Sequence, residues 1–189
     1  MTEKKLPEDL PLKYMKETGR ENFSDLCLDA TRAVFAHVYY IWKTLKKELG
    51  SKDALELYWK VWEGLAEVSF VQAKQALGLS EIKDIPTLGR IFQFCWLAYP
   101  CIYNIQEETP DSHVGIIDFC PNPAYGPIDN HMDRLDYYKQ EAELSRRFVW
   151  KLVELAGMKD VVDADQDLFL CRDGCTDVCR VFARKKKEA

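Results

Sequence analysis

The feature that most constrains the fold of this chain is a change in hydrophobic period near residue 100. Before it, apolar residues recur every three or four positions, which is the spacing of amphipathic helices. From there on, Cys101, Tyr103 and Ile105 stand at alternate positions, which is the period of a β-strand. The sequence therefore predicts an α+β protein.

Three helices are predicted before the change of period. The first starts at Asn22 and ends at Gly50, the second runs from Ser51 to Gly78, and the third begins at Pro86. Because Gly50 and Ser51 leave almost no loop, we expect the first two helices to form an antiparallel hairpin. The apolar stripe of the first helix comprises Leu26, Ala30, Val34, Val38, Ile41, Leu45 and Leu49. It predicts a core-facing helix.

Two strand pairs and one further helix are predicted after the change. The strands Cys101–Glu108 and His113–Phe119 form a hairpin, a long helix covers His131–Ala156, and the strands Gln166–Cys171 and Cys175–Ala183 form a second pair. The element order is therefore αααββαββ. A helical hairpin and further helices packed on a four-stranded, mostly antiparallel sheet would bury the apolar stripes.

The 189 residues fit one domain. We expect a polar N-terminal arm over residues 1–21, a single α+β domain over 22–184 and a basic tail over 185–189. Within the domain, residues 158–165 form an acidic stretch that predicts a connector before the last strand pair.

Charge and hydropathy argue against two classes of partner, nucleic acids and membranes. A net charge of −5 argues against nucleic acid as a partner, and no apolar run reaches the ~20 residues that span a bilayer. The first residues lack the apolar core of a signal peptide, and an odd total of seven cysteines does not suit a disulfide framework. These features predict reduced thiols in the cytoplasm. The sequence is compatible with both a monomer and a homodimer.

Cys120 is the first candidate for chemistry. The sequence Asp118-Phe119-Cys120-Pro121 ends a predicted strand and passes an acid and a thiol to a proline-flanked loop. A thiol needs a base or a lowered pKa to act as a nucleophile, and His131 or His113 would supply an imidazole. Asp118 is a candidate general base, or else pairs with an arginine such as Arg134 or Arg146. The alternative is that Cys120 only closes a strand.

Zinc is the possible cofactor. Cys171, Cys175 and Cys179 bracket a predicted turn, and Cys120 ends a strand of the same sheet, so four thiolates would form a tetrahedral site if they met. The spacing differs from the common Cys-x2-Cys knuckle. The alternative is that these cysteines are small buried hydrophobes.

A small-molecule pocket is the third hypothesis. The aromatic residues Trp62, Trp96 and Tyr103 would line a pocket for a planar ligand. At helical spacing, aromatic side chains also serve as core residues, which is the alternative interpretation. Phosphate-binding glycine loops and hydrolase triads are absent from the sequence.

Several short segments carry a family resemblance. The segment Leu49–Ala54 with the helix of Trp59 and Trp62, the sequence Asp118-Phe119-Cys120-Pro121 and a terminal cysteine-bearing strand resemble the L-2-amino-thiazoline-4-carboxylic acid hydrolase-like proteins and related proteins of anaerobic microbes, over about residues 25–183. The resemblance implies ring-opening hydrolysis of a small sulfur heterocycle. It implies a role for Cys120, with Cys175 or Cys179 as the C-terminal cysteine. A further cysteine of the family is replaced by the stretch Met132–Tyr138.

The element order is also similar to that of the vinyl-reductase-like and haem nitric-oxide-binding domains, and this similarity implies a pocket between helices and sheet. The leading hypothesis is a hydrolase of a small heterocyclic or amide substrate, with Cys120 at the pocket and Asp118 or His131 as the acid or base. The alternatives are a non-catalytic small-molecule-binding or sensory domain and a zinc-stabilised structural protein.

Overall fold

The computed structural model describes Lys16, Gly19 and residues 23–99, 101–120, 134–168 and 178–187. Its element order matches the predicted one, and the protein is α+β. The elements are α2 (Phe23–Leu49), α3 (Ser51–Ala76), α4 (Ile85–Leu97), β1 (Ile102–Thr109), β2 (Ser112–Phe119), α6 (Arg134–Leu155), β3 (Val162–Leu168) and β4 (Cys179–Lys185). Most of the predicted arm, residues 1–21, lies outside this description. No helix in the described ranges is long and apolar enough to cross a membrane.

The sheet has four strands in the order β1-β2-β4-β3, and every neighbouring pair is antiparallel. The last strand, β4, therefore lies between β2 of the first hairpin and β3, which precedes it in the chain. Cys179 pairs with Ile117 of β2, and Val181 pairs with Gln166 of β3. This register brings the last strand beside the end of β2, where Cys120 follows.

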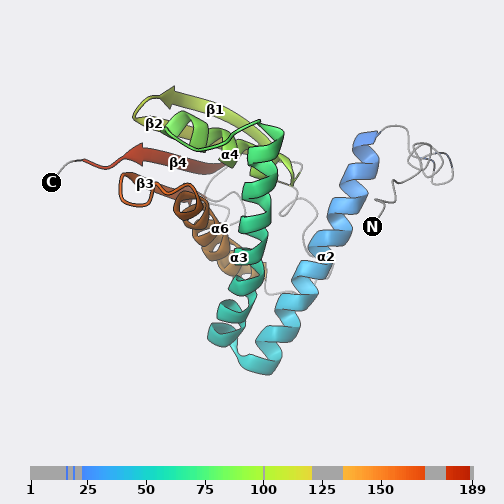
Figure 1. The fold of residues 1–189 in the computed structure, drawn as a ribbon. Coiled ribbons are helices and arrows are strands. Elements are labelled where there is room, and N and C mark those ends of the chain that lie inside the picture. The colour runs from blue at the N-terminus through green and yellow to red at the C-terminus, as the bar shows by residue number, and fades with distance from the viewer. Residues whose placement is uncertain are drawn as a thin grey trace, which may run out of the picture.

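The helix boundaries follow from capping residues. Asp84 caps α4, because its carboxylate accepts a hydrogen bond from the Thr87 backbone N–H at 2.7 Å, and Pro86 occupies the first turn. Gly50 has a φ of 78°, a value that glycine adopts without strain, and it links α2 directly to α3. Figure 1 shows these two helices meeting at that link and diverging toward their other ends.

The core lies between one face of the sheet and the helices α3, α4 and α6 (Figure 1). Its helical part includes Leu88, Ile91, Phe92, Phe148, Val149, Leu152 and Val153, all fully buried. A smaller cluster joins α2 to α3 and α6, and its members are Tyr39, Trp42, Ala54, Tyr58 and Leu144. The helices thus cover one face of the sheet as two connected layers of apolar side chains.

The third strand begins earlier than the sequence indicated. Residues predicted as an acidic connector belong partly to β3, which starts at Val162 rather than Gln166. Its buried side chains are Val162, Ala164 and Gln166, while Asp163, Asp165 and Asp167 alternate with them on the other face. There Asp165 pairs with Arg146 and Asp167 with Arg180. The charged run is therefore the outer face of a half-buried strand.

The fourth strand is also displaced. The sequence predicted Cys175–Ala183, whereas β4 spans Cys179–Lys185; Cys175 lies outside the described residues. Lys185 and Lys186, which were assigned to the tail, donate backbone hydrogen bonds to the carbonyls of Asp111 and Val161.

The predicted apolar face of α2 is largely exposed, which corrects the expectation that it faces the core. Val34, Ile41 and Leu49 are about half exposed, whereas Tyr39 and Trp42 are buried. The buried rings pack against α3, where Trp42 lies 6.4 Å from Tyr58 between ring centroids. Aromatic area, rather than the aliphatic stripe, decides which side of α2 meets its neighbour.

Candidate functional site

A cavity of about 290 Å³ lies between the helices and the sheet, and we call it the helix–sheet pocket. Side chains from α2, α3, α4, α6 and the inner face of the sheet line it. The pocket accompanies the divergence of α2 and α3, because the two helices stay in contact near Gly50 and separate toward their other ends (Figure 1). The pocket is therefore a product of helix packing around the sheet.

Aromatic residues form one wall of the helix–sheet pocket. The wall consists of Tyr58 and Trp62 from α3 and of Trp96 and Tyr99 at the end of α4. Phe148, behind this wall, stacks on Trp96 with ring centroids 5.5 Å apart and meets Trp62 edge-on at 5.9 Å. These contacts hold both indole rings in place. Trp62 and Trp96, two of the three residues predicted to line a pocket, thus line the helix–sheet pocket.

The opening of the pocket is apolar. Val34 of α2 and Val61 and Leu65 of α3 line the pocket, yet Val34 is 51% and Val61 63% exposed. Lining residues that remain exposed must lie where the cavity meets solvent. A ligand entering between α2 and α3 therefore passes aliphatic side chains first.

Three polar side chains also line the pocket. Glu141 and Ser145 lie one turn apart on α6, and Gln166 reaches the pocket from β3. Glu141 is 4% exposed and accepts a hydrogen bond from Gln140 Nε2 at 2.5 Å. Burial raises the pKa of the Glu141 carboxyl to about 7, and the Gln140 hydrogen bond partly opposes this shift. Near neutral pH this carboxyl can therefore both give and accept a proton.

Two buried polar atoms of the pocket have no hydrogen-bond partner among the described residues. They are Nε1 of Trp96, which is 7% exposed, and Oε1 of Gln166, which is 4% exposed. Leaving a buried donor or acceptor unpaired costs about 1–3 kcal/mol. Five such atoms occur in the described residues, and these two belong to residues that line one cavity, which makes the pocket a candidate binding site.

Three cysteines also line the pocket, namely Cys101, Cys120 and Cys179. Cys120 lies there because β2 ends just before it, and Cys179 because β4 pairs with β2. Cys171 and Cys175, the other predicted zinc ligands, lie outside the described residues. Across the part of the chain that the structure describes, no group of three or more His, Cys, Asp or Glu residues is placed to hold a metal ion.

The remaining predicted site residues lie elsewhere. Asp118 is exposed and accepts a hydrogen bond from Asn104 Nδ2, and it does not line the pocket. Side chains alternate along a strand, so the neighbour of the pocket-lining Ile117 points to the opposite face. Arg146, a candidate partner of Asp118, pairs with Asp165 instead. His131 lies outside the described residues.

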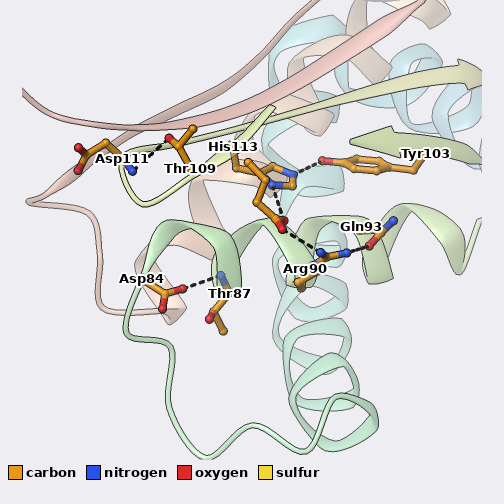
Figure 2. A network of polar contacts seen from close by, with 9 residues as sticks. Asp84, Thr87, Arg90, Gln93, Tyr103, Thr109, Asp111 and His113 are labelled. Carbon is orange, nitrogen blue, oxygen red and sulfur yellow. Dashed lines mark hydrogen bonds and ion pairs between the residues drawn. The ribbon is translucent and has the colours of Figure 1, made fainter. Parts of the chain in front are cut away.

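Tyr103 belongs to a second, partly buried polar cluster rather than to the pocket. We call this cluster the His113 network; it comprises Arg90, Tyr103, Glu108 and His113. The Tyr103 hydroxyl lies 3.0 Å from His113 Nε2, His113 Nδ1 lies 3.7 Å from Glu108, and Arg90 bonds Glu108 at 2.8 Å. Figure 2 shows these contacts joining α4 to the first hairpin. His113 was a candidate base for Cys120, but it does not line the pocket.

Glu141 is the pocket residue that sequence reasoning missed. It lies seven positions before Phe148, a member of the predicted apolar stripe of the last helix, so both side chains occupy one helix face. A carboxylate on the buried face of an amphipathic helix is costly unless it has a partner or a function. The position of Glu141 on the apolar face of the helix was therefore the sequence signal that could have identified it as a site residue.

Comparisons of the chain with models of known protein families, with curated proteins and with solved structures find no match. The class of site is thus defined by geometry, as a partly open, mainly apolar pocket whose lining carries a buried carboxyl and two residues with unpaired polar atoms.

Proposed function

We propose that this protein binds a small molecule in the helix–sheet pocket. The observation that carries the proposal is an apolar cavity of about 290 Å³ with the buried carboxyl of Glu141 on its wall. Ligand pockets in proteins are mainly apolar and aromatic and have a few convergent polar groups. A titratable group with a shifted pKa in such a cavity is a further sign of a functional site.

A substitution that fills the opening of the helix–sheet pocket tests this proposal. In the Leu65→Trp variant, an indole would occupy the apolar opening between α2 and α3, whereas Val68→Trp adds the same indole to an exposed position of α3 that does not line the pocket. Titration with 2-naphthol, followed calorimetrically, should show one saturable site in the wild type and in Val68→Trp, and weaker binding by at least about tenfold in Leu65→Trp. Equal binding by all three proteins would contradict the proposal.

A second candidate function is hydrolysis of a C–N bond in a small heterocyclic or amide substrate. It is favoured by the Cys120 thiol and the Glu141 carboxyl lining the same pocket, and it agrees with the family resemblance. Because the pKa of Glu141 is about 7, both its protonated and ionised forms are populated near neutral pH. In this role Glu141 takes the place that the sequence suggested for Asp118 or His131.

The proposed reaction has two stages. The Glu141 carboxylate takes the proton of the Cys120 thiol, and the sulfur attacks the carbon of the amide or amidine group. Glu141 then gives the proton to the leaving nitrogen as the C–N bond breaks, which leaves an acyl–sulfur intermediate. Water attacks this intermediate through Glu141 as base, the C–S bond breaks, and the proton returns to the thiol.

Cys120→Ser separates the two candidates. The test incubates the protein with 2-amino-thiazoline-4-carboxylate and with small lactams, and follows ring opening by mass spectrometry as the addition of one water. A hydrolase loses turnover in Cys120→Ser, while a binding protein keeps its affinity. Cys27→Ser on α2, away from the pocket lining, is the matched control. If Cys120→Ser opens the rings as fast as the wild type, Cys120 is not the nucleophile; if the wild type opens none of them, the hydrolase candidate is wrong.

A further inference from the structure

We propose that the ligand of the helix–sheet pocket has an uncharged, amide-like head group that accepts a hydrogen bond from Trp96 Nε1 and donates one to Gln166 Oε1. This inference rests on the proposed function, because it assumes that the pocket holds a ligand. It adds the chemical class of that ligand, which we take to be a flat lactam or carboxamide.

Trp96 supplies the donor. Its ring is held by stacking on Phe148 at an interplanar angle of 26°, so the indole cannot turn freely to find another partner. The ring is 7% exposed, lines the pocket, and its Nε1 has no partner among the described residues. The indole N–H is a donor only. The complementary group on the ligand is therefore an acceptor, such as a carbonyl oxygen.

Gln166 supplies the acceptor. It lies on β3 opposite Val181 of β4, and its backbone N–H is already bonded to Asp165. Its side chain lines the pocket at 4% exposure, between the apolar positions of the inner sheet face. The Oε1 atom has no partner within the described part of the chain. A ligand N–H would satisfy it.

The pair of unpaired atoms selects against charged head groups. An ammonium ion has no acceptor for Trp96 Nε1, and a carboxylate has no donor for Gln166 Oε1. A carboxylate would also meet Glu141 in the same pocket, and that carboxyl ionises around neutral pH. Of the common head groups, an amide or lactam satisfies both atoms without bringing a charge.

The shape of the pocket indicates a planar ligand. Tyr58 and Trp62 stand beside Trp96 in the lining, and aromatic faces pack best on flat rings. The aliphatic opening at Val61 and Leu65 accommodates an apolar substituent beyond the head group. The ligand class is thus a flat ring that carries adjacent C=O and N–H groups and an otherwise apolar body.

Four bicyclic compounds of similar size test this inference. Oxindole has both C=O and N–H, N-methyloxindole keeps only the C=O, indole keeps only the N–H, and indane has neither. Calorimetric titration of the wild type at pH 7 should give the tightest binding for oxindole. Each missing group should weaken binding by about three- to tenfold.

Two variants assign the preference to its residues. Trp96→Phe removes the donor and should abolish the advantage that the carbonyl gives, and Gln166→Met removes the acceptor and should abolish the advantage of the N–H. Indane, which uses neither group, reports any change of pocket shape in each variant, so the readout is the affinity of the other compounds relative to indane within the same variant. Circular dichroism verifies that each variant is folded, and either variant alone tests its own contact.

The outcomes separate the two levels of inference. Equal affinities of the four compounds for the wild type would overturn the head-group class and leave the small-molecule pocket standing. Tighter binding of indane-2-carboxylate than of oxindole would overturn the uncharged head group. If none of the compounds binds, or if Leu65→Trp binds them as well as the wild type does, the pocket is not their site and both inferences are wrong.

Discussion

Glu141 and His113 are both ionisable side chains buried between helices and sheet, but the space around them differs. His113 is 0% exposed, its ring lies against Gly89 of α4, and a Cβ at that glycine would overlap the ring. Glu141 lines a cavity of about 290 Å³. The comparison teaches that open volume beside a buried polar group, which His113 lacks and Glu141 has, is what makes a region a candidate binding site.

The hydrogen bonding of the two regions differs less. The Tyr103 hydroxyl lies 3.0 Å from His113 Nε2. The Glu108 carboxylate faces His113 Nδ1 and accepts a hydrogen bond from Arg90. Beside Glu141, the described residues leave Trp96 Nε1 and Gln166 Oε1 without a partner. His113 Nδ1 likewise has no hydrogen-bond partner among the described residues, so the two regions differ in open volume rather than in the presence of an unpaired atom.

The largest expected effect comes from disturbing the filled region. Gly89→Ala would place a Cβ inside the His113 ring, and both the helix backbone and the buried ring resist displacement. We expect a loss of at least about 3 kcal/mol in the free energy of unfolding. Urea denaturation measures it.

The matched control is Gly64→Ala on α3, where a Cβ meets no described atom within 4 Å. This change should stabilise the helix by up to about 1 kcal/mol, because alanine has the higher helix propensity. Equal stabilities of the two variants would show that the region around His113 is not tightly filled.

Removing the charge of the pocket carboxyl should have the next largest effect. The pKa of Glu141 rises on folding from 4.5 to about 7, so the folded state favours the protonated form. The stability that this group contributes is present below pH 4.5 and is lost as the pH rises through 7. The wild type should therefore lose on the order of 3 kcal/mol relative to Glu141→Gln across that range. Urea denaturation of both proteins from pH 5 to 8 measures the difference; a flat difference would contradict the shift.

His113 should show the opposite pH dependence. Burial lowers the pKa of its imidazole below 6.5, and nearby Glu108 opposes this shift in part. The folded state then favours the neutral ring, so its stability contribution is present above pH 6.5 and is lost as the pH falls through the folded pKa. The stability difference between the wild type and His113→Gln should decrease on acidification. An increase on acidification would mean that the folded protein favours the charged ring.

Single polar groups can be compared directly. Tyr103→Phe removes the hydroxyl that satisfies His113 Nε2 and should cost about 1–3 kcal/mol, because a buried nitrogen loses its partner. Gln166→Met removes an amide whose Oε1 has no partner among the described residues, so it should be neutral or stabilising by up to about 1 kcal/mol in the ligand-free protein. Thermal unfolding distinguishes the two, and a costly Gln166→Met would show that this amide is bonded in the empty pocket.

The fold was predictable from the sequence because the hydrophobic period and the capping residues indicate the same element boundaries. Gly50, Asp84 and the alternation that begins at Cys101 place most helix and strand boundaries close to where they lie. The failure at β3 has a physical cause, since Asp163 and Asp165 belong to a strand whose outer face pairs acids with arginines. Charge alone indicated a connector there.

The site was less predictable because it depends on how helices diverge. Trp62 and Trp96 could be proposed from their size, but the cavity beside them depends on how α2, α3, α4 and α6 pack around the sheet. Glu141 lies on a stripe of α6 that the sequence shows, yet whether that position meets open volume or packed side chains is decided by the tertiary structure. The same limit explains why Tyr103 was assigned to the pocket rather than to His113.

The smallest effect on stability is expected from filling the pocket itself. Ile117 lines the pocket from β2 and is buried on the inner face of the sheet. Added side-chain volume costs energy where a core is full, but here it can enter the cavity, so Ile117→Phe should change the free energy of unfolding by less than about 1 kcal/mol. It should nevertheless weaken 2-naphthol binding by at least about tenfold, because the ring takes the place of the ligand. If Ile117→Phe destabilised the protein as much as Gly89→Ala, the pocket would be as tightly packed as the surroundings of His113, and the difference between the two regions would disappear.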